Sequence, residues 1–175
     1  METVVAAALI IILVLLSMLT LTYACISAQT GLLESWRAMD ERALERSRTS
    51  LSPVGAGMEA TGDVVTITLK NDGSVKLSDL RQWDVVLEYV TPTGRMAGWY
   101  PYAQAADPGQ NQWALQGIYH DAAKALPEVQ DPGIVNPGEE LVIRVKVSPP
   151  VKVGTAGVAT VSTPNGIAAS LAFVK

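Results

Sequence analysis

The sequence predicts an α+β protein in which one long, hydrophobic N-terminal α-helix precedes an immunoglobulin-like antiparallel β-sandwich. Three observations support this fold class: an uncharged segment from Thr3 to Leu33, a charged amphipathic continuation, and short alternating segments separated by Pro and Gly turns. The predicted domains are an N-terminal helix, 1–52, with a hydrophobic part, 1–31, and an amphipathic part, 32–52, followed by a β-sandwich, 53–175.

The hydrophobic part of the helix has three interpretations. Val4–Ile26 is almost purely apolar, and about 20 apolar residues cross the hydrocarbon core of a bilayer. A cleaved signal peptide needs a basic start and a shorter core, but the first basic residue is Arg37. A membrane anchor fits the length but usually carries flanking basic residues. We favour a filament subunit, whose helix is held in the membrane and later buried among copies of itself.

This interpretation predicts an assembly core on the hydrophobic part of the helix. Its members are large apolar side chains that have no partner within a single helix. They are Val4, Val5, Leu9, Ile12, Leu13, Leu16, Leu19, Tyr23 and Ile26.

The amphipathic part continues the helix towards Leu51. Leu32, Trp36, Met39 and Ala43 follow the 4-3-4 spacing of one helix face, and we call them the helix seam. A helix from Thr3 to about Leu51 is roughly 70 Å long. A helix of this length, apolar on all sides at one end, needs partners outside its own chain.

Pro53, Gly55 and Gly57 are predicted to end the helical pattern and to form a hinge before the sandwich. Gly and Pro differ strongly in backbone freedom, so this stretch is expected to let subunits adopt different poses. A plain linker is the alternative interpretation.

The remaining sequence predicts about seven short strands. Alternating apolar residues mark each strand, and turns such as Asn71–Ser74 separate them. The segment Asp121–Leu126 is compatible with one helical turn. The predicted strands are Val64–Lys70, Trp83–Tyr89, Arg95–Tyr102, Trp113–Tyr119, Glu140–Val147, Val158–Ser162 and Ile167–Val174. The number of strands and their turns are typical of a β-sandwich.

Aromatic residues occur on both faces of one predicted strand. Tyr100 and Tyr102 share a face opposite Trp99, and a single core cannot absorb both faces. Exposed aromatic residues are typical of interface centres. We therefore predict that Trp99, Tyr100 and Tyr102 contribute contacts between neighbouring subunits in a filament sheath.

The sequence argues against an enzyme. Its one histidine, His120, and its one cysteine, Cys25, lie in different predicted domains, and no catalytic or phosphate-binding motif is found. Loop aspartates at 107, 121 and 131 lack the spacing of a calcium loop and are more typical of turns. The net charge of −4 without a basic stripe argues against nucleic acid. We expect no cofactor and no metal.

The order of an apolar helix, Gln29–Leu33, a charged helical extension and a sandwich resembles the archaellin and type IV pilin-like superfamily. The sandwich also resembles the archaellum stator proteins, in Val64–Ser74 (VVTITLKNDGS), Val135–Glu139 (VNPGE) and Ser162–Gly166 (STPNG). Type IV pilins typically carry a glutamate at the fifth mature position, where this sequence has Val5. This departure fits archaellins, which lack that glutamate.

The resemblance implies a structural subunit of an extracellular, archaellum-like filament that serves swimming motility. It implies many copies of the chain as partners, the membrane before assembly, and a leader peptidase and an assembly motor. A short basic leader removed before Met1 is expected, unless Met1 is the initiator. The alternatives are a membrane-anchored stator-like protein that binds the cell envelope and an adhesive type IV pilin.

Overall fold

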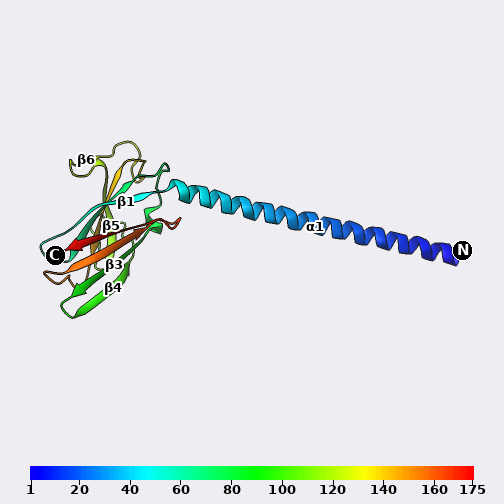
Figure 1. Cartoon of the computed structure of the whole chain (residues 1–175), viewed down its shortest axis with the longest axis horizontal. Coiled ribbons are helices and arrows are strands. Elements are labelled where there is room, and N and C mark those ends of the chain that lie inside the picture. The colour runs from blue at the N-terminus through cyan, green and yellow to red at the C-terminus, as the bar shows by residue number, and fades with distance from the viewer. The chain divides into compact units, whose positions relative to one another are not determined.

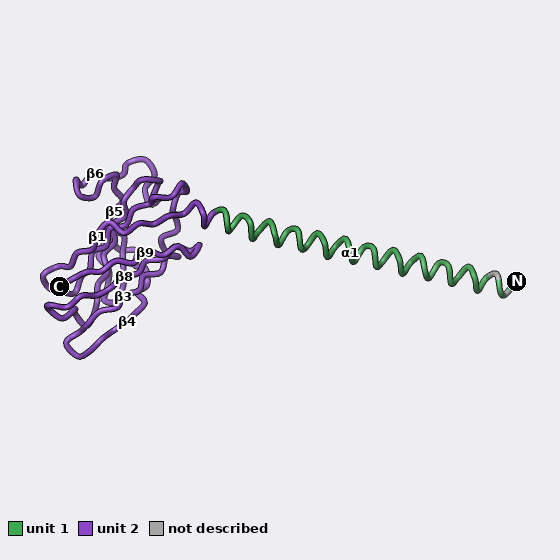
Figure 2. The backbone as a smooth tube through the Cα atoms, viewed as in Figure 1, with its two compact units in different colours: residues 1–44 green, residues 45–175 purple. Residues whose placement is uncertain are grey.

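The computed structural model describes Met1, Thr3 and residues 5–175, so the predicted core position Val4 lies outside the described residues. The chain divides into two compact units, Met1–Leu44 and Glu45–Lys175 (Figure 2). The first unit is almost all of the single α-helix, α1 (Glu2–Arg48). The second unit contains the last turn of α1 and every strand.

Nine antiparallel strands form the second unit within the described residues, in two sheets (Figure 1). One sheet has the order β1-β2-β7-β5-β6 and the other β4-β3-β8-β9. The bounds are β1 Leu51–Met58, β2 Val64–Asn71, β3 Asp84–Thr91, β4 Gly94–Tyr100, β5 Gln112–Asp121, β6 Leu126–Pro127, β7 Glu140–Lys146, β8 Ala156–Ser162 and β9 Ala168–Val174; a 3₁₀ turn, η1 Leu80–Gln82, precedes β3.

The predicted fold class is confirmed: a long apolar helix is followed by an antiparallel sandwich. The strand orders match the two sheets of an immunoglobulin-like domain, with β1, β2, β7 and β5 in one layer and β4, β3, β8 and β9 in the other. Alternation explains the core, because every second residue of a strand faces the same side. Val65, Ile67 and Leu69 of β2 are fully buried, as are Val85 and Leu87 of β3.

The end of the helix differs from the prediction. Helix α1 ends at Arg48, and Pro53, Gly55 and Gly57 are not a segment between helix and sandwich but part of β1, paired with β2. The register shifts between Pro53 and Gly55. Strand β1 is at the edge of its sheet, where proline is tolerated because one side of an edge strand makes no ladder hydrogen bonds. The predicted hinge therefore lies inside a strand.

One further local prediction was wrong, and one short strand was not predicted. The segment Asp121–Leu126 is not a helical turn but a tight turn joining β5 to β6, with Ala125 in the left-handed region at φ 52°. The Ala125 N–H bonds to the carbonyl of Ala122 at 3.1 Å. Strand β6 itself was not predicted, because a pair of residues carries no periodicity.

Candidate assembly surfaces

The surface of α1 is apolar and uncovered along the hydrophobic part of the helix. The predicted core positions from Val5 to Ile26 are all exposed, with Leu16 58% and Tyr23 76% accessible. From Val5 onwards, α1 is long and apolar enough to cross a membrane. Nothing in the first unit covers these side chains, so they are available to lipid or to other helices.

Several hydroxyl groups within the hydrophobic part of the helix donate hydrogen bonds to backbone carbonyls of the same helix. Ser17 Oγ donates to the Leu13 carbonyl at 2.7 Å, and Thr22 Oγ1 donates to the Met18 carbonyl at 2.8 Å. Thr30 Oγ1 donates to the Ile26 carbonyl at 2.7 Å. A polar group without a partner is costly where water is absent. These back-bonded hydroxyls suit a helix that works in a dry environment.

The helix seam is uncovered too. Leu32, Trp36 and Met39 are all more than half exposed, with Trp36 at 64%, and Ala43 is exposed beside them. An indole is a large apolar side chain with one N–H donor. The seam therefore extends the apolar surface of α1 into its charged half.

Three sequence patches that carried the resemblance meet around the last turn of α1 within the second unit. The Ser74 N–H donates to the Arg48 carbonyl at 2.9 Å, and the Asp72 N–H donates to the Ser50 carbonyl at 3.0 Å. From the β8–β9 turn, Asn165 Nδ2 donates to Thr49 Oγ1 at 2.7 Å. We call this group of contacts the helix socket. It satisfies the Arg48 carbonyl, one of those that the end of a helix leaves without partners.

Buried Asn71 links the socket to the third patch. Its side-chain Nδ2 donates to the carbonyls of Val75, at 2.8 Å, and Val135, at 2.9 Å, while its Oδ1 accepts the Gly73 N–H at 3.1 Å. Its backbone carbonyl accepts the Gly138 N–H at 2.7 Å. One fully buried amide therefore fixes the Asn71–Ser74 turn and the Val135–Glu139 turn together.

Replacing Gly73 with alanine is expected to disrupt the socket. A Cβ there would lie 2.5 Å from the Arg48 carbonyl oxygen and 2.6 Å from the Ser50 backbone nitrogen, and backbone cannot move aside as a flexible side chain does. Overpacking of this kind costs roughly 1–3 kcal/mol. Chemical denaturation of the full chain in detergent, monitored by near-UV circular dichroism, measures the change in the free energy of unfolding. Gly57→Ala, which meets nothing within 4 Å, is the matched control, and equal stabilities of the two variants would contradict the expectation.

The aromatic cluster on β4 is only partly as predicted. Trp99 is 59% exposed, and its Nε1 donates to Asp84 Oδ1 at 2.8 Å. Tyr100, in contrast, is 2% exposed and packs in the core, where its hydroxyl bonds to Tyr89 Oη at 3.3 Å. Burial raises the pKa of Tyr100. Tyr100 therefore cannot contact a neighbouring subunit, and this part of the prediction was wrong.

Tyr102 is half-buried, so its exposure lies between those of Trp99 and Tyr100. It lies beyond the end of β4, pairs with Trp113 in an isolated bridge, and contacts its indole edge-to-face with ring centroids 4.8 Å apart. The chain crosses from one sheet towards the other at this point, so the face alternation expected of one long strand ends at Tyr100. Trp99 remains the aromatic side chain of this cluster that is most available to a partner.

On the outer face of the β4-β3-β8-β9 sheet, Trp99 has the carboxylate of Asp84 on one side and apolar side chains on the other. Trp99 is opposite Val86, which is opposite Thr160 on β8. Val86, Val158 and Val174 are exposed. This face has no cover within the part of the chain that the structure describes.

The loop aspartates do not converge. Asp131 pairs with Lys76 at 2.8 Å, Asp121 with Lys124 at 2.7 Å, and Asp107 lies 3.5 Å from Arg144. Hydrogen bonds from the two lysines lower the pKa of Asp131 and Asp121. Among the described residues, no group of three or more His, Cys, Asp or Glu is arranged to hold a metal ion.

The sequence matches no known protein-family model and no curated protein. Among solved structures, the chain is similar to the archaeal flagellum of Methanospirillum hungatei, with a TM-score of 0.62 and 11% identity over 97% of this chain and 92% of that chain. It is also similar to the archaellum periplasmic stator protein FlaG from Sulfolobus acidocaldarius, with a TM-score of 0.51 and 21% identity over 71% of this chain and 99% of that chain.

A third similar structure is the complex of the stator proteins FlaF and FlaG from Sulfolobus acidocaldarius. Its TM-score is 0.50 and its identity 20%, over 70% of this chain and 87% of that chain. The resemblance to archaellum proteins that the sequence predicted is thus confirmed for the fold. Two of the three are described as archaellum stator proteins and the third as an archaeal flagellum.

Proposed function

We propose that this chain is a structural, non-enzymatic subunit of an archaellum-like extracellular filament, in which it polymerises through α1. The observation that carries the proposal is the uncovered apolar surface of α1 from Val5 to Ile26, with its internally satisfied hydroxyls. The similarity to a filament protein over nearly the whole chain, helix included, supports the same proposal.

Burial of the assembly core keeps an assembled helix from leaving the filament for water. Each large apolar side chain contributes roughly 1.5–3 kcal/mol when it is fully buried. The eight described core positions therefore contribute roughly 12–24 kcal/mol per subunit. Ordering and association cost at least several kcal/mol of this gross figure. This gross figure is measured against water, so it opposes dissociation of a subunit into solution without covalent links. Transfer of α1 from lipid to the filament gains less, because lipid tails are as apolar as the side chains, and close packing between helices must supply that step.

In this proposal the chain passes through two environments. Before assembly, α1 is inserted in the membrane, and afterwards it is packed among copies of itself outside the cell. A leader peptidase and an assembly motor are the partners that the resemblance implies for this route. Rotation of the finished filament would serve swimming.

A stator-like envelope protein is the second candidate. The observation that favours it is the higher identity to the stator proteins, 20–21% over about 70% of this chain, than to the filament protein, 11% over 97% of this chain. In that role α1 would stay in the membrane as an anchor, and the sandwich would bind the envelope. An adhesive pilin would combine filament assembly with a foreign ligand on the sandwich.

Electron microscopy of the full chain purified from cells distinguishes the candidates. A filament subunit gives negatively stained filaments in the fraction sheared from the cell surface. A stator-like protein stays in the membrane fraction and forms no filament after detergent removal. Absence of filaments from the sheared fraction and after detergent removal would overturn the proposed function.

Trp99→Lys is expected to weaken lateral contacts between sandwiches without unfolding them. Truncating a central interface tryptophan typically costs about 2 kcal/mol or more, and lysine adds a charge that must be desolvated. Filament yield and the temperature of filament dissociation measure the effect. Val129→Lys, at another strongly exposed apolar position, is the control. If both variants assemble like the parent chain, Trp99 does not lie in a sheath contact.

A further inference from the structure

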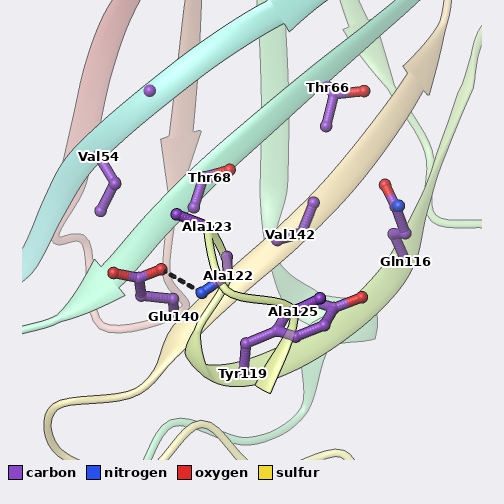
Figure 3. A pocket seen from close by; sticks show the side chains of 11 residues that line it. Val54, Thr66, Thr68, Gln116, Tyr119, Ala122, Ala123, Ala125, Glu140 and Val142 are labelled. Carbon is purple, nitrogen blue, oxygen red and sulfur yellow. Dashed lines mark hydrogen bonds between the residues drawn. The ribbon is translucent and has the colours of Figure 1, made fainter. Parts of the chain in front are cut away.

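A cleft of about 420 Å³ hollows the outer face of the β1-β2-β7-β5-β6 sheet. Thr66 and Thr68 of β2 and Val142 of β7 line it from the sheet, Val54 and Gly55 from β1, and Gln116 and Tyr119 from β5 (Figure 3). The turn from Ala122 to Ala125 supplies the remaining wall, together with Glu140. All of these residues belong to the second unit.

The cleft results from two glycines and a bulge on this sheet face. A sheet face is hollow where neighbouring positions lack side chains, and Gly55 and Gly117 are paired with Thr68 and Val142 on this face. The β5 register shifts between Leu115 and Gly117, which leaves Gln116 as an extra residue in a bulge. Bulges redirect side chains and often occur at functional sites.

Two contacts fix the walls of the cleft. Glu140 Oε2 accepts the Ala122 N–H at 2.8 Å and so holds the turn (Figure 3). The Tyr119 side chain lies over Gly117, where a Cβ would come within 2.8 Å of its hydroxyl oxygen and 2.9 Å of its ring. Glycine at position 117 therefore lets the Tyr119 ring pack against the sheet instead of projecting into solvent.

The polar groups of the cleft are left with unused hydrogen-bonding capacity. Within the described part of the chain, the hydroxyls of Thr66, Thr68 and Tyr119 and the amide of Gln116 form no hydrogen bond, and Glu140 uses one carboxylate oxygen only. No lysine or arginine lines the cleft. The site thus offers several hydroxyl-type donors and acceptors, one carboxylate acceptor, and an apolar strip formed by Val54, Val142 and the alanines.

We propose that this cleft binds a neutral hexose, presented as a unit of a glycan. A pyranose ring has an apolar C–H face, which suits the tyrosine ring and the valines, and a rim of hydroxyls, which suits the threonines, the amide and the carboxylate. Pockets that combine an apolar lining with a few placed polar groups are typical of small-ligand sites. The unpaired Glu140 carboxylate excludes an acidic sugar or a phosphate. This inference rests on the cleft alone and holds whether the chain forms a filament or a stator.

Saturation-transfer-difference NMR on the full chain tests the proposal. The probes are glucose, galactose and mannose and their methyl glycosides, whose blocked anomeric carbon imitates a unit within a glycan. The chain is kept in a zwitterionic detergent, because maltoside detergents themselves carry sugar. We expect saturation transfer to at least one hexose with a millimolar Kd, the range that ligands of this size reach in an open cleft. Stronger transfer to the methyl glycoside than to the free sugar would identify the glycan unit as the ligand.

A matched pair of glycine variants links binding to the cleft. A Cβ added at Gly55 or at Gly57 would have no other atom within 4 Å, but only Gly55 lines the cleft. Gly55→Val fills the cleft without backbone strain and is expected to weaken binding about tenfold or more, whereas Gly57→Val leaves it unchanged. Tyr119→Ala is expected to abolish the signal. Equal binding by the two valine variants would overturn the proposal.

A cationic ligand is the competing explanation for an unpaired carboxylate, and butylammonium tests it. We expect no saturation transfer to butylammonium, and only a few-fold loss of hexose binding in Glu140→Gln, which keeps an oxygen acceptor for the Ala122 N–H. Transfer to butylammonium that Glu140→Gln removes, without transfer to any sugar, would overturn the hexose assignment. Because filament formation is scored separately by microscopy, failure of this inference leaves the proposed function untouched.

Discussion

Replacing Ile12 or Leu16 with aspartate is expected to abolish filament formation completely while leaving the sandwich folded. Both side chains are exposed on α1 in the isolated chain and are predicted to be buried among helices after assembly. Burying an unpaired carboxylate costs several kcal/mol. In a helical polymer every subunit carries the change, so the cost recurs at every contact. Negative-stain microscopy and sedimentation of the assembled fraction measure the outcome.

Membrane insertion is the step that must be controlled in this experiment. An aspartate at the centre of a membrane helix costs about 2.5–3.5 kcal/mol, whereas each surrounding leucine, isoleucine or valine contributes about −0.3 to −0.6 kcal/mol. With this many apolar neighbours the variant helix still inserts, which flotation with vesicles verifies. Leu16→Met, which conserves volume and apolarity, is the matched control and should assemble normally. Normal filaments from both aspartate variants would refute the helix-core interpretation.

Asn71→Ala is expected to be the most destabilising single change in the sandwich turns, by roughly 3 kcal/mol. The side chain is fully buried and makes three hydrogen bonds, to Val75, Val135 and Gly73. Alanine leaves the buried Val135 carbonyl and the part-buried Val75 carbonyl without their donor. Each lost hydrogen bond costs about 1 kcal/mol or more when the partner stays buried.

Denaturant titration of the full chain in detergent measures this loss through the tryptophans of the sandwich. Gln110→Ala, at an exposed turn position, removes an amide of similar chemistry and should change the free energy of unfolding by less than about 0.5 kcal/mol. Asn71→Asp keeps the acceptor for the Gly73 N–H but loses both donated bonds, and it should be at least as unstable as the alanine variant. If Asn71→Ala lowers the free energy of unfolding by less than Gly73→Ala does, the Asn71 amide does not organise the socket.

The sequence predicted the elements whose signals are local. The uncharged segment identified α1, and alternation identified β2, β3 and β7, in which mainly every second residue is buried. Strand β1 escaped prediction because its residues, including Pro53, Gly55 and Gly57, have low strand propensity. Tertiary pairing with β2 makes it a strand, and a local pattern does not contain that information.

The surfaces were predicted less completely than the fold. Alternation alone assigned Tyr100 and Trp99 to opposite faces correctly, but it could not say which face met the other sheet. The cleft around Gly55 and Tyr119 depends on residues of four strands and one turn, so no single stretch of sequence reveals it. The helix socket had a visible signal, since its three patches all combine asparagine and glycine in turns, yet their convergence is a property of the sandwich.

The helix socket also sets an order of events during synthesis. Thr49 is held by Asn165, and 116 residues separate the two along the chain. At about 5–20 residues per second, a ribosome takes roughly 6–23 s to translate that interval. The apolar helix emerges first and is available to the membrane throughout this time, whereas its last turn cannot be fastened until the final hairpin has been made. The proposed insertion of the helix into the bilayer therefore has time to occur before the sandwich is completed on the nascent chain.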